Sequence, residues 1–96
     1  MYDSKIRTPE TDMLFQAILS LKTEEDCYRF FEDVCTIKEI RDIAQRLEVA
    51  RLLKSGETVA AIAQQTGAST TTVSRVNRCL HYGAGGYAAV LEQLEK

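Results

Sequence analysis

The stretch that decides the fold is GASTTTVSR, Gly67 to Arg75. Four hydroxyl side chains in a row, Ser69 to Thr72, follow a glycine and an alanine where a helix is expected to begin. Threonine is a mediocre helix former because its branched side chain is stiff. Ser69 is explained as an N-cap, since its oxygen can accept a hydrogen bond from a free main-chain N–H of the first turn. Capping accounts for one hydroxyl, so the others need a different role.

The residues around this stretch have the spacing of a helix-turn-helix. Ala63 is small at a point where two helices would approach closely, and Gly67 follows at a turn that favours a positive φ. Val73 and Val76 lie where they can pack back onto the preceding helix. The spacing predicts a helix-turn-helix over residues 58–81, although an αα-hairpin with no role in DNA binding would show a similar pattern.

The rest of the chain also predicts helices, so the fold class is all-α. Capping residues, prolines and glycines give the start and stop signals. They place a helix from Pro9 to about Leu21, a second after Thr23, a third between Thr36 and Gly56, and a last one after the glycine-rich Tyr82–Tyr87. The third is apolar over more than one face, which is typical of a helix with several neighbours. A chain of 96 residues fits a single domain, residues 1–96, and we expect residues 1–8 to form a flexible arm.

Charge is distributed unevenly along the chain, although the net charge is only −2. The segment from Thr58 to Leu91 contains no acidic residue, and eleven of the fourteen acids lie between Glu10 and Glu57. Such asymmetry can create a locally positive surface on a weakly acidic protein, or the segment can simply be polar and uncharged. In a helix-turn-helix the start of the second helix enters the major groove. The predicted DNA-binding residues are Ser69, Thr70, Thr71, Thr72, Ser74, Arg75 and Arg78.

Several classes of protein are excluded by what the sequence lacks. No apolar run is long enough to cross a bilayer, and no signal-peptide pattern is present, so we expect a cytoplasmic protein. Cys27, Cys35 and Cys79 form no CxxC pair and His81 is the one histidine, which argues against a metal site. We find no glycine-rich phosphate loop and no convincing nucleophile–base pair, so we expect neither an enzyme nor a cofactor.

The stretch from Cys35 through TGASTTTVSR to the NRCL segment resembles the Trp repressor family, and more closely its YerC/YecD-type branch. The resemblance implies a six-helix protomer in an intertwined homodimer. The N-terminal helices and the long third helix of two chains would then share one core. The two recognition helices would enter successive major grooves of double-stranded DNA, about 34 Å apart.

The resemblance also implies a ligand pocket. In the repressors two arginines sandwich the indole ring of tryptophan, and Arg46 and Arg75 stand at the matching positions, with Thr36 at the position of a carbonyl partner. Two positions depart from the family pattern. Val76 replaces a glycine beside the indole, and Cys79 replaces a serine by a much weaker hydrogen-bonding group. Overfilling a tight pocket typically costs ~1–3 kcal/mol, so we expect no tryptophan to bind.

The sequence therefore predicts a sequence-specific transcriptional regulator, a repressor in the first instance, that acts as a homodimer without tryptophan. Two alternatives stay open. One is a ligand-gated regulator that holds an amino acid or another small metabolite between Arg46 and Arg75. The other is a helical protein-interaction module, because positions that are basic or amide-bearing in the repressors are Val59, Ala60 and Ala63 in this chain.

Overall fold

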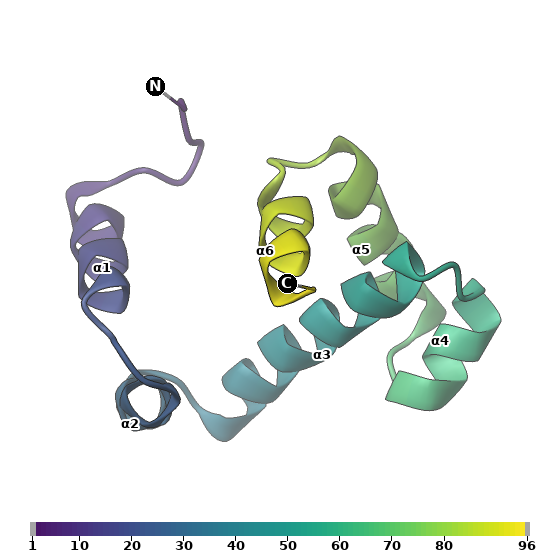
Figure 1. The fold of residues 1–96 in the computed structure, drawn as a ribbon, viewed down its shortest axis with the longest axis horizontal. Helices are drawn as coiled ribbons and strands as arrows, with labels where there is room; N and C mark the ends of the chain where they lie inside the picture. The colour runs from purple at the N-terminus through teal and green to yellow at the C-terminus, as the bar shows by residue number, and fades with distance from the viewer. Residues whose placement is uncertain (1, 96) are drawn as a thin grey trace. The chain divides into compact units, whose positions relative to one another are not determined.

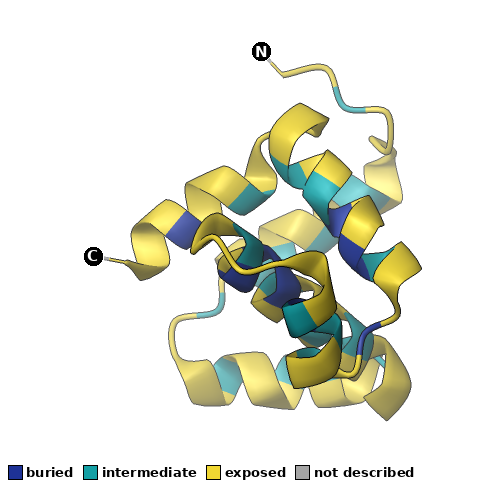
Figure 2. Cartoon of the chain, turned by 90° about the vertical axis from the view of Figure 1, so that its right-hand side faces the viewer, coloured by how far each residue is buried: buried dark blue, intermediate teal, exposed yellow. Residues whose placement is uncertain are grey.

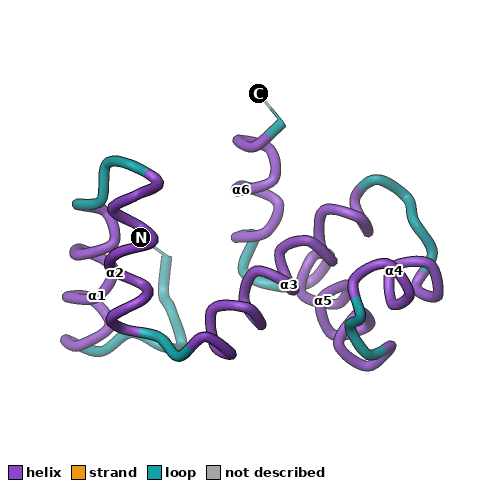
Figure 3. Tube along the Cα trace, turned by 90° about the horizontal axis from the view of Figure 1, so that it is seen from below, coloured by secondary structure: helices purple, strands orange, loops and turns teal. Residues whose placement is uncertain are grey.

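The computed structural model describes residues 2–95, which form six α-helices joined by short loops, with no strand in that range (Figures 1 and 3). The helices are α1 (Pro9–Leu19), α2 (Glu24–Val34), α3 (Ile37–Lys54), α4 (Val59–Thr66), α5 (Thr70–Tyr82) and α6 (Gly86–Leu94). The all-α, six-helix prediction is confirmed. The chain divides into two compact units, residues 1–37 and residues 38–96.

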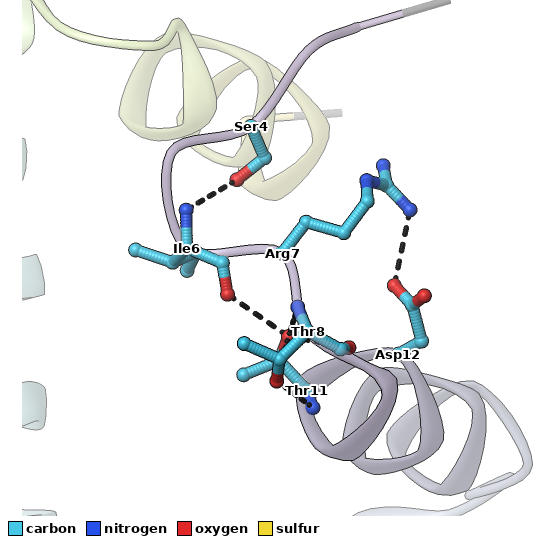
Figure 4. A network of polar contacts seen from close by, with 6 residues as sticks. All are labelled: Ser4, Ile6, Arg7, Thr8, Thr11 and Asp12. Atoms are coloured by element: carbon cyan, nitrogen blue, oxygen red, sulfur yellow. Dashed lines mark hydrogen bonds and ion pairs between the residues drawn. The ribbon is translucent and has the colours of Figure 1, made fainter.

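The N-terminal unit begins with a network of polar contacts that fixes the start of α1 (Figure 4). Thr8 is the N-cap, as predicted, and its side chain accepts a hydrogen bond from the main-chain N–H of Thr11. The Thr11 hydroxyl in turn accepts from the N–H of Thr8 at 2.7 Å and donates to the carbonyl of Ile6 at 2.9 Å. Arg7 forms an ion pair of 3.0 Å with Asp12. These contacts join the chain before Pro9 to the first turn of the helix.

The second half of this unit shows two small differences from the predicted helix ends. Helix α1 ends at Leu19 and not at Leu21, because the Ser20 hydroxyl and main-chain N–H both bond to the carbonyl of Ala17. Thr23 caps α2 as expected, and the Asp26 carboxylate accepts from the N–H of Lys22 and not from that of Thr23.

Neither α1 nor α2 buries a residue over Pro9–Leu19 or Glu24–Val34. Several large apolar side chains are instead exposed by half or more of their surface: Met13, Leu19, Tyr28, Val34 and Ile37. Isolated helices of eleven residues are marginal in water, and most helical stability in proteins comes from burying an apolar face. We therefore expect the apolar side chains of this unit to be buried against another protein surface.

The C-terminal unit contains almost all of α3 together with α4, α5 and α6. Gly56, with φ of +94°, ends α3 in a Schellman arrangement: the N–H of Glu57 bonds to the carbonyl of Leu52, and the N–H of Gly56 bonds to the carbonyl of Leu53. The predicted role of Gly56 is confirmed. The sharp turn then lets α4 begin three residues later, with Thr58 as its N-cap.

One hydrophobic core holds this unit together, and its buried residues come from four helices and the turn before α5 (Figure 2). Ile62 of α4 and Val73 and Val76 of α5 are at most 1 % exposed, so the predicted packing between these helices is confirmed. Ala63, Leu47, Leu53, Leu80 and Tyr87 pack against the same core from its edge. The buried residues are Val49, Ala50, Leu52, Ile62, Ala68, Val73, Val76 and Leu91.

A glycine-rich connection joins α5 to α6. The N–H of Gly83 bonds to the carbonyl of Cys79 at 2.8 Å and ends α5, and Gly85, with φ of +88°, precedes α6. A Cβ on Gly83 would lie 2.4 Å from the carbonyl oxygen of Cys79, so no larger residue fits there without movement of the main chain. Because α5 ends at Gly83 and α6 is capped at Gly85, the connection is short. Helix α6 then packs onto the core through Leu91.

Candidate nucleic-acid interface

The turn between α4 and α5 is fixed by several hydrogen bonds. Gly67, with φ of +77°, donates from its N–H to the carbonyl of Ala63 at 2.9 Å. The Thr66 hydroxyl donates to the carbonyl of Ile62 and accepts from the N–H of Ala68. Ala68 is buried in the core. The angle at which α5 leaves the turn is therefore set by the main chain and by packing.

Ser69 caps α5, as predicted, and its hydroxyl has two partners. Its oxygen accepts from the main-chain N–H of Thr72 at 3.0 Å, and the same hydroxyl donates to the Thr72 side-chain oxygen at 3.0 Å. Thr72 is half-buried. Ser69 and Thr72 thus serve the structure of the helix start, although both are among the predicted DNA-binding residues.

The other five predicted residues lie together on the outer side of α5. Thr71, Ser74, Arg75 and Arg78 follow the i, i+3, i+4, i+7 spacing of one helix face, while Val73 and Val76 face the core. The five predicted residues are all exposed. Together they line an open hollow of about 580 Å³, whose walls are Thr70, Thr71, Ser74, Arg75 and Arg78. The structure brings these five side chains into one surface, which we call the α5 face.

The α5 face carries free positive charge and free hydroxyl groups. Within residues 2–95, no ion pair engages Arg75 or Arg78, and no hydrogen bond engages the side chains of Thr70, Thr71 or Ser74. The main-chain N–H groups at the start of a helix add partial positive charge at its leading end. Phosphate groups and the edges of bases are the partners that suit such a surface.

The residues predicted for a ligand pocket are distributed over several elements of the chain. Arg46 and Cys79 line a second hollow, of about 570 Å³, in the C-terminal unit. Arg75 lines the hollow on the α5 face, and Val76 is 1 % exposed within the core. Thr36 belongs to the N-terminal unit, where it is exposed directly before α3. A ligand held between Arg46 and Arg75 stays a prediction.

Sequence reasoning missed most of the walls of the second hollow. Besides Arg46 and Cys79 they comprise Ile43, Leu47, Gly83, Ala84, Gly86, Tyr87 and Val90. The apolar stripes of α3 and α6 were visible in the sequence, but nothing in it pairs one stripe with the other. The main-chain carbonyl of Thr66 also has a distant partner that no local pattern indicates, the side-chain amide of Gln45 at 3.2 Å.

The profile of the Trp repressor protein family matches residues 9–95, which is nearly the whole chain. The chain belongs to the Trp repressor family. This family consists of DNA-binding transcription regulators, and the resemblance drawn from TGASTTTVSR is confirmed.

Individual members of the Trp repressor family are similar over almost their full length. The uncharacterised protein YerC of Bacillus subtilis is 54 % identical over 96 residues, which are all of this chain and 92 % of YerC. A TrpR-like protein of Eubacterium eligens superposes with a TM-score of 0.90 at 55 % identity, over 95 % of this chain and 94 % of that one. A candidate Trp repressor of Staphylococcus aureus gives the same TM-score at 47 % identity, over 95 % and 91 % of the two chains.

In the described part of the chain, no helix is both long enough and apolar enough to pass through a membrane. Across residues 2–95, no three histidine, cysteine, aspartate or glutamate side chains gather closely enough to hold a metal ion.

Proposed function

We propose that the protein is a sequence-specific DNA-binding repressor of transcription that acts as a homodimer and needs no tryptophan. The observation that carries this proposal is the α5 face. Its two arginines and three hydroxyl side chains have no partner among residues 2–95, and they stand on the outer side of a helix whose start is fixed by a hydrogen-bonded turn. Family membership supports a role in DNA binding.

The homodimer is supported by the apolar side chains of the N-terminal unit. Leu19 is 83 % exposed, Ile37 is 69 % and Met13 is 68 %, and neither helix of this unit buries a residue over its described length. Large apolar side chains left exposed across one unit suit an interaction site. A second copy of the chain supplies the same apolar side chains and can cover them reciprocally.

Independence from tryptophan is supported by the positions of Arg46, Arg75 and Val76. Val76 fills the core beside Val73, and the two arginines line different hollows. Calorimetry with tryptophan at millimolar concentrations should show no heat of binding. Binding at micromolar affinity would overturn this part of the proposal.

A second candidate function is a regulator gated by another small molecule. It is favoured by the 570 Å³ hollow, where Arg46 and Cys79 stand among apolar side chains. A hollow of this size lies in the range of small-molecule sites, and one arginine among apolar walls suits an anionic group on an apolar body. A screen for metabolites that raise the melting temperature distinguishes this function, with Arg46→Ala as the comparison.

The proposed function is tested by selecting duplex DNA from a random pool with the full chain. The expected result is a palindromic consensus with half-sites about one helical turn apart, bound less tightly as salt rises. Arg75→Ala should weaken binding at every salt concentration, while Arg29→Ala on α2, whose partner is Glu25, should not. If no sequence is enriched and binding is insensitive to salt, a protein-interaction module becomes the better interpretation.

A further inference from the structure

The general role in DNA binding does not say which bases the α5 face recognises, but the side chains of this face indicate one base. We propose that the protein recognises thymine in duplex DNA through its C5-methyl group, which would contact the methyl groups of Thr70 and Thr71. This inference rests on the proposed DNA-binding function and names the bases that the same surface prefers.

The first step of the argument is that not all hydroxyls at the start of α5 are available. Ser69 and Thr72 bond to each other and to the helix main chain. Thr70, Thr71 and Ser74 have no such partner among residues 2–95 and line the hollow. The surface that meets a base is therefore made of two threonines and one serine.

The second step concerns what these side chains can distinguish. A hydroxyl both donates and accepts, so it suits the edge of any base and selects none strongly. Bidentate side chains select single bases, arginine for guanine and asparagine or glutamine for adenine. None of them occurs in the first turn, Ser69 to Thr72. Arg75 and Arg78 begin further along the helix, where they suit phosphates.

The third step is that threonine carries a group which does discriminate. In the major groove only thymine presents a methyl group, and an apolar contact with that methyl is the way in which small side chains recognise it. Thr71 lies on the exposed face near its N-terminal end, seven residues before Arg78 and on the same side of the helix. Thr70 is beside it at the leading end. Both threonines are exposed, so their methyl groups are accessible to a base in the groove.

The experiment removes single methyl groups from the DNA and from the protein. Synthetic duplexes carrying the selected consensus are made with each thymine replaced in turn by deoxyuridine, which lacks only the C5-methyl. At one or more positions per half-site, binding should weaken about fourfold, the factor expected from leaving one methyl group unburied. Replacing cytosine by 5-methylcytosine outside these positions should change binding little.

Protein variants connect the effect to α5. In Thr71→Ser, which loses a methyl and keeps the hydroxyl, deoxyuridine at the position contacted by Thr71 should no longer weaken binding, and Thr70→Ser should act likewise at its own position. In Thr71→Val, which keeps the methyl, the fourfold effect should remain. Thr23→Ser loses a methyl from the α2 cap and keeps the capping hydroxyl, so it should behave as the native chain does.

Two results would overturn the inference while leaving the proposed function intact. One is tight, sequence-specific binding that no deoxyuridine substitution changes. The other is sensitivity to 7-deazaguanine, which lacks the N7 acceptor, combined with insensitivity to deoxyuridine, since that would assign base recognition to Arg75. Failure to select any DNA sequence would instead overturn the proposed function itself.

Discussion

The side-chain amide of Gln45 donates a hydrogen bond to the main-chain carbonyl of Thr66, 3.2 Å away, and so joins the middle of α3 to the last residue of α4. The two residues are 21 positions apart. Since Gly67 and the α5 cap follow directly, this bond supports the turn from which the α5 face is presented.

Gln45→Ala should therefore lower stability, because it leaves a part-buried carbonyl without its partner. A typical loss for one hydrogen bond is about 0.5–1.5 kcal/mol. Urea unfolding of the variant measures it. Gln64→Ala is the control, because Gln64 is exposed on α4 and no hydrogen bond engages its side chain among residues 2–95. Equal stability of the two variants would contradict a structural role for Gln45.

Ser69→Ala should destabilise the protein by about 1 kcal/mol, the usual cost of removing a helix N-cap. Ser69→Asn, which can also cap, should restore most of that stability. Ser74→Ala on the same helix should leave stability within about 0.5 kcal/mol of the native value, because its hydroxyl is exposed. The order of melting temperatures tests this assignment of roles, and a large effect at Ser74 would contradict it.

Arg78→Ala should weaken DNA binding to all sequences and make it less dependent on salt. Each phosphate contact contributes about 0.9 to the slope of log affinity against log salt, so a dimer that loses two contacts should lose about 2 from this slope. Fluorescence anisotropy at four or more salt concentrations gives the slope. An unchanged slope would mean that Arg78 makes no phosphate contact.

Gly83→Ala and Gly86→Ala form a matched pair. A methyl at Gly83 would meet the carbonyl of Cys79, and such overpacking typically costs about 1–3 kcal/mol. A methyl at Gly86, the first residue of α6, meets nothing within 4 Å and should add about 0.4–1 kcal/mol by restricting the unfolded chain. Thermal unfolding should move in opposite directions for the two variants, and a shift in the same direction would refute the interpretation.

The dependence of stability on pH should include a small contribution from Glu48. A hydrogen bond from Arg51 lowers the pKa of Glu48 below its ordinary value of 4.5. Because the pKa is lower in the folded state, the stabilisation is present above pH 4.5 and is lost as the pH falls through the folded-state pKa. The Glu48 side chain is 46 % exposed, so the pair should contribute only about 0.2–1 kcal/mol. Glu48→Gln should be less stable than the native protein at pH 7, and the two should converge as the pH falls below the folded-state pKa of Glu48.

The sequence could predict what is decided within a few residues. Thr8, Thr23 and Ser69 cap helices with bonds to the main chain three residues on, and Gly56 and Gly67 end helices by adopting a positive φ. Each of these signals is local, which is why helix starts were predicted more accurately than the end of α1. Ser20 ends that helix through its hydroxyl, and serine is no general stop signal.

The sequence could not predict what depends on helices meeting in space. Val73 and Val76 were assigned correctly to the side of α5 that faces α4, because spacing alone places them there. Nothing in their spacing separates the five exposed residues of the α5 face from Ser69 and Thr72, whose hydroxyls bond to each other. The second hollow needs α3 and α6 to be placed together before Arg46 and Cys79 become neighbours of Tyr87.

The lack of any buried side chain in α1 and α2 has a consequence for control by abundance. If a second copy of the chain buries these side chains, then stable folding requires two chains to associate and depends on protein concentration. Dilution then favours the unpaired form, which proteases can cut. Such a regulator would have a built-in threshold: below a certain copy number per cell it would be degraded before reaching its operator, and above it occupancy would rise steeply.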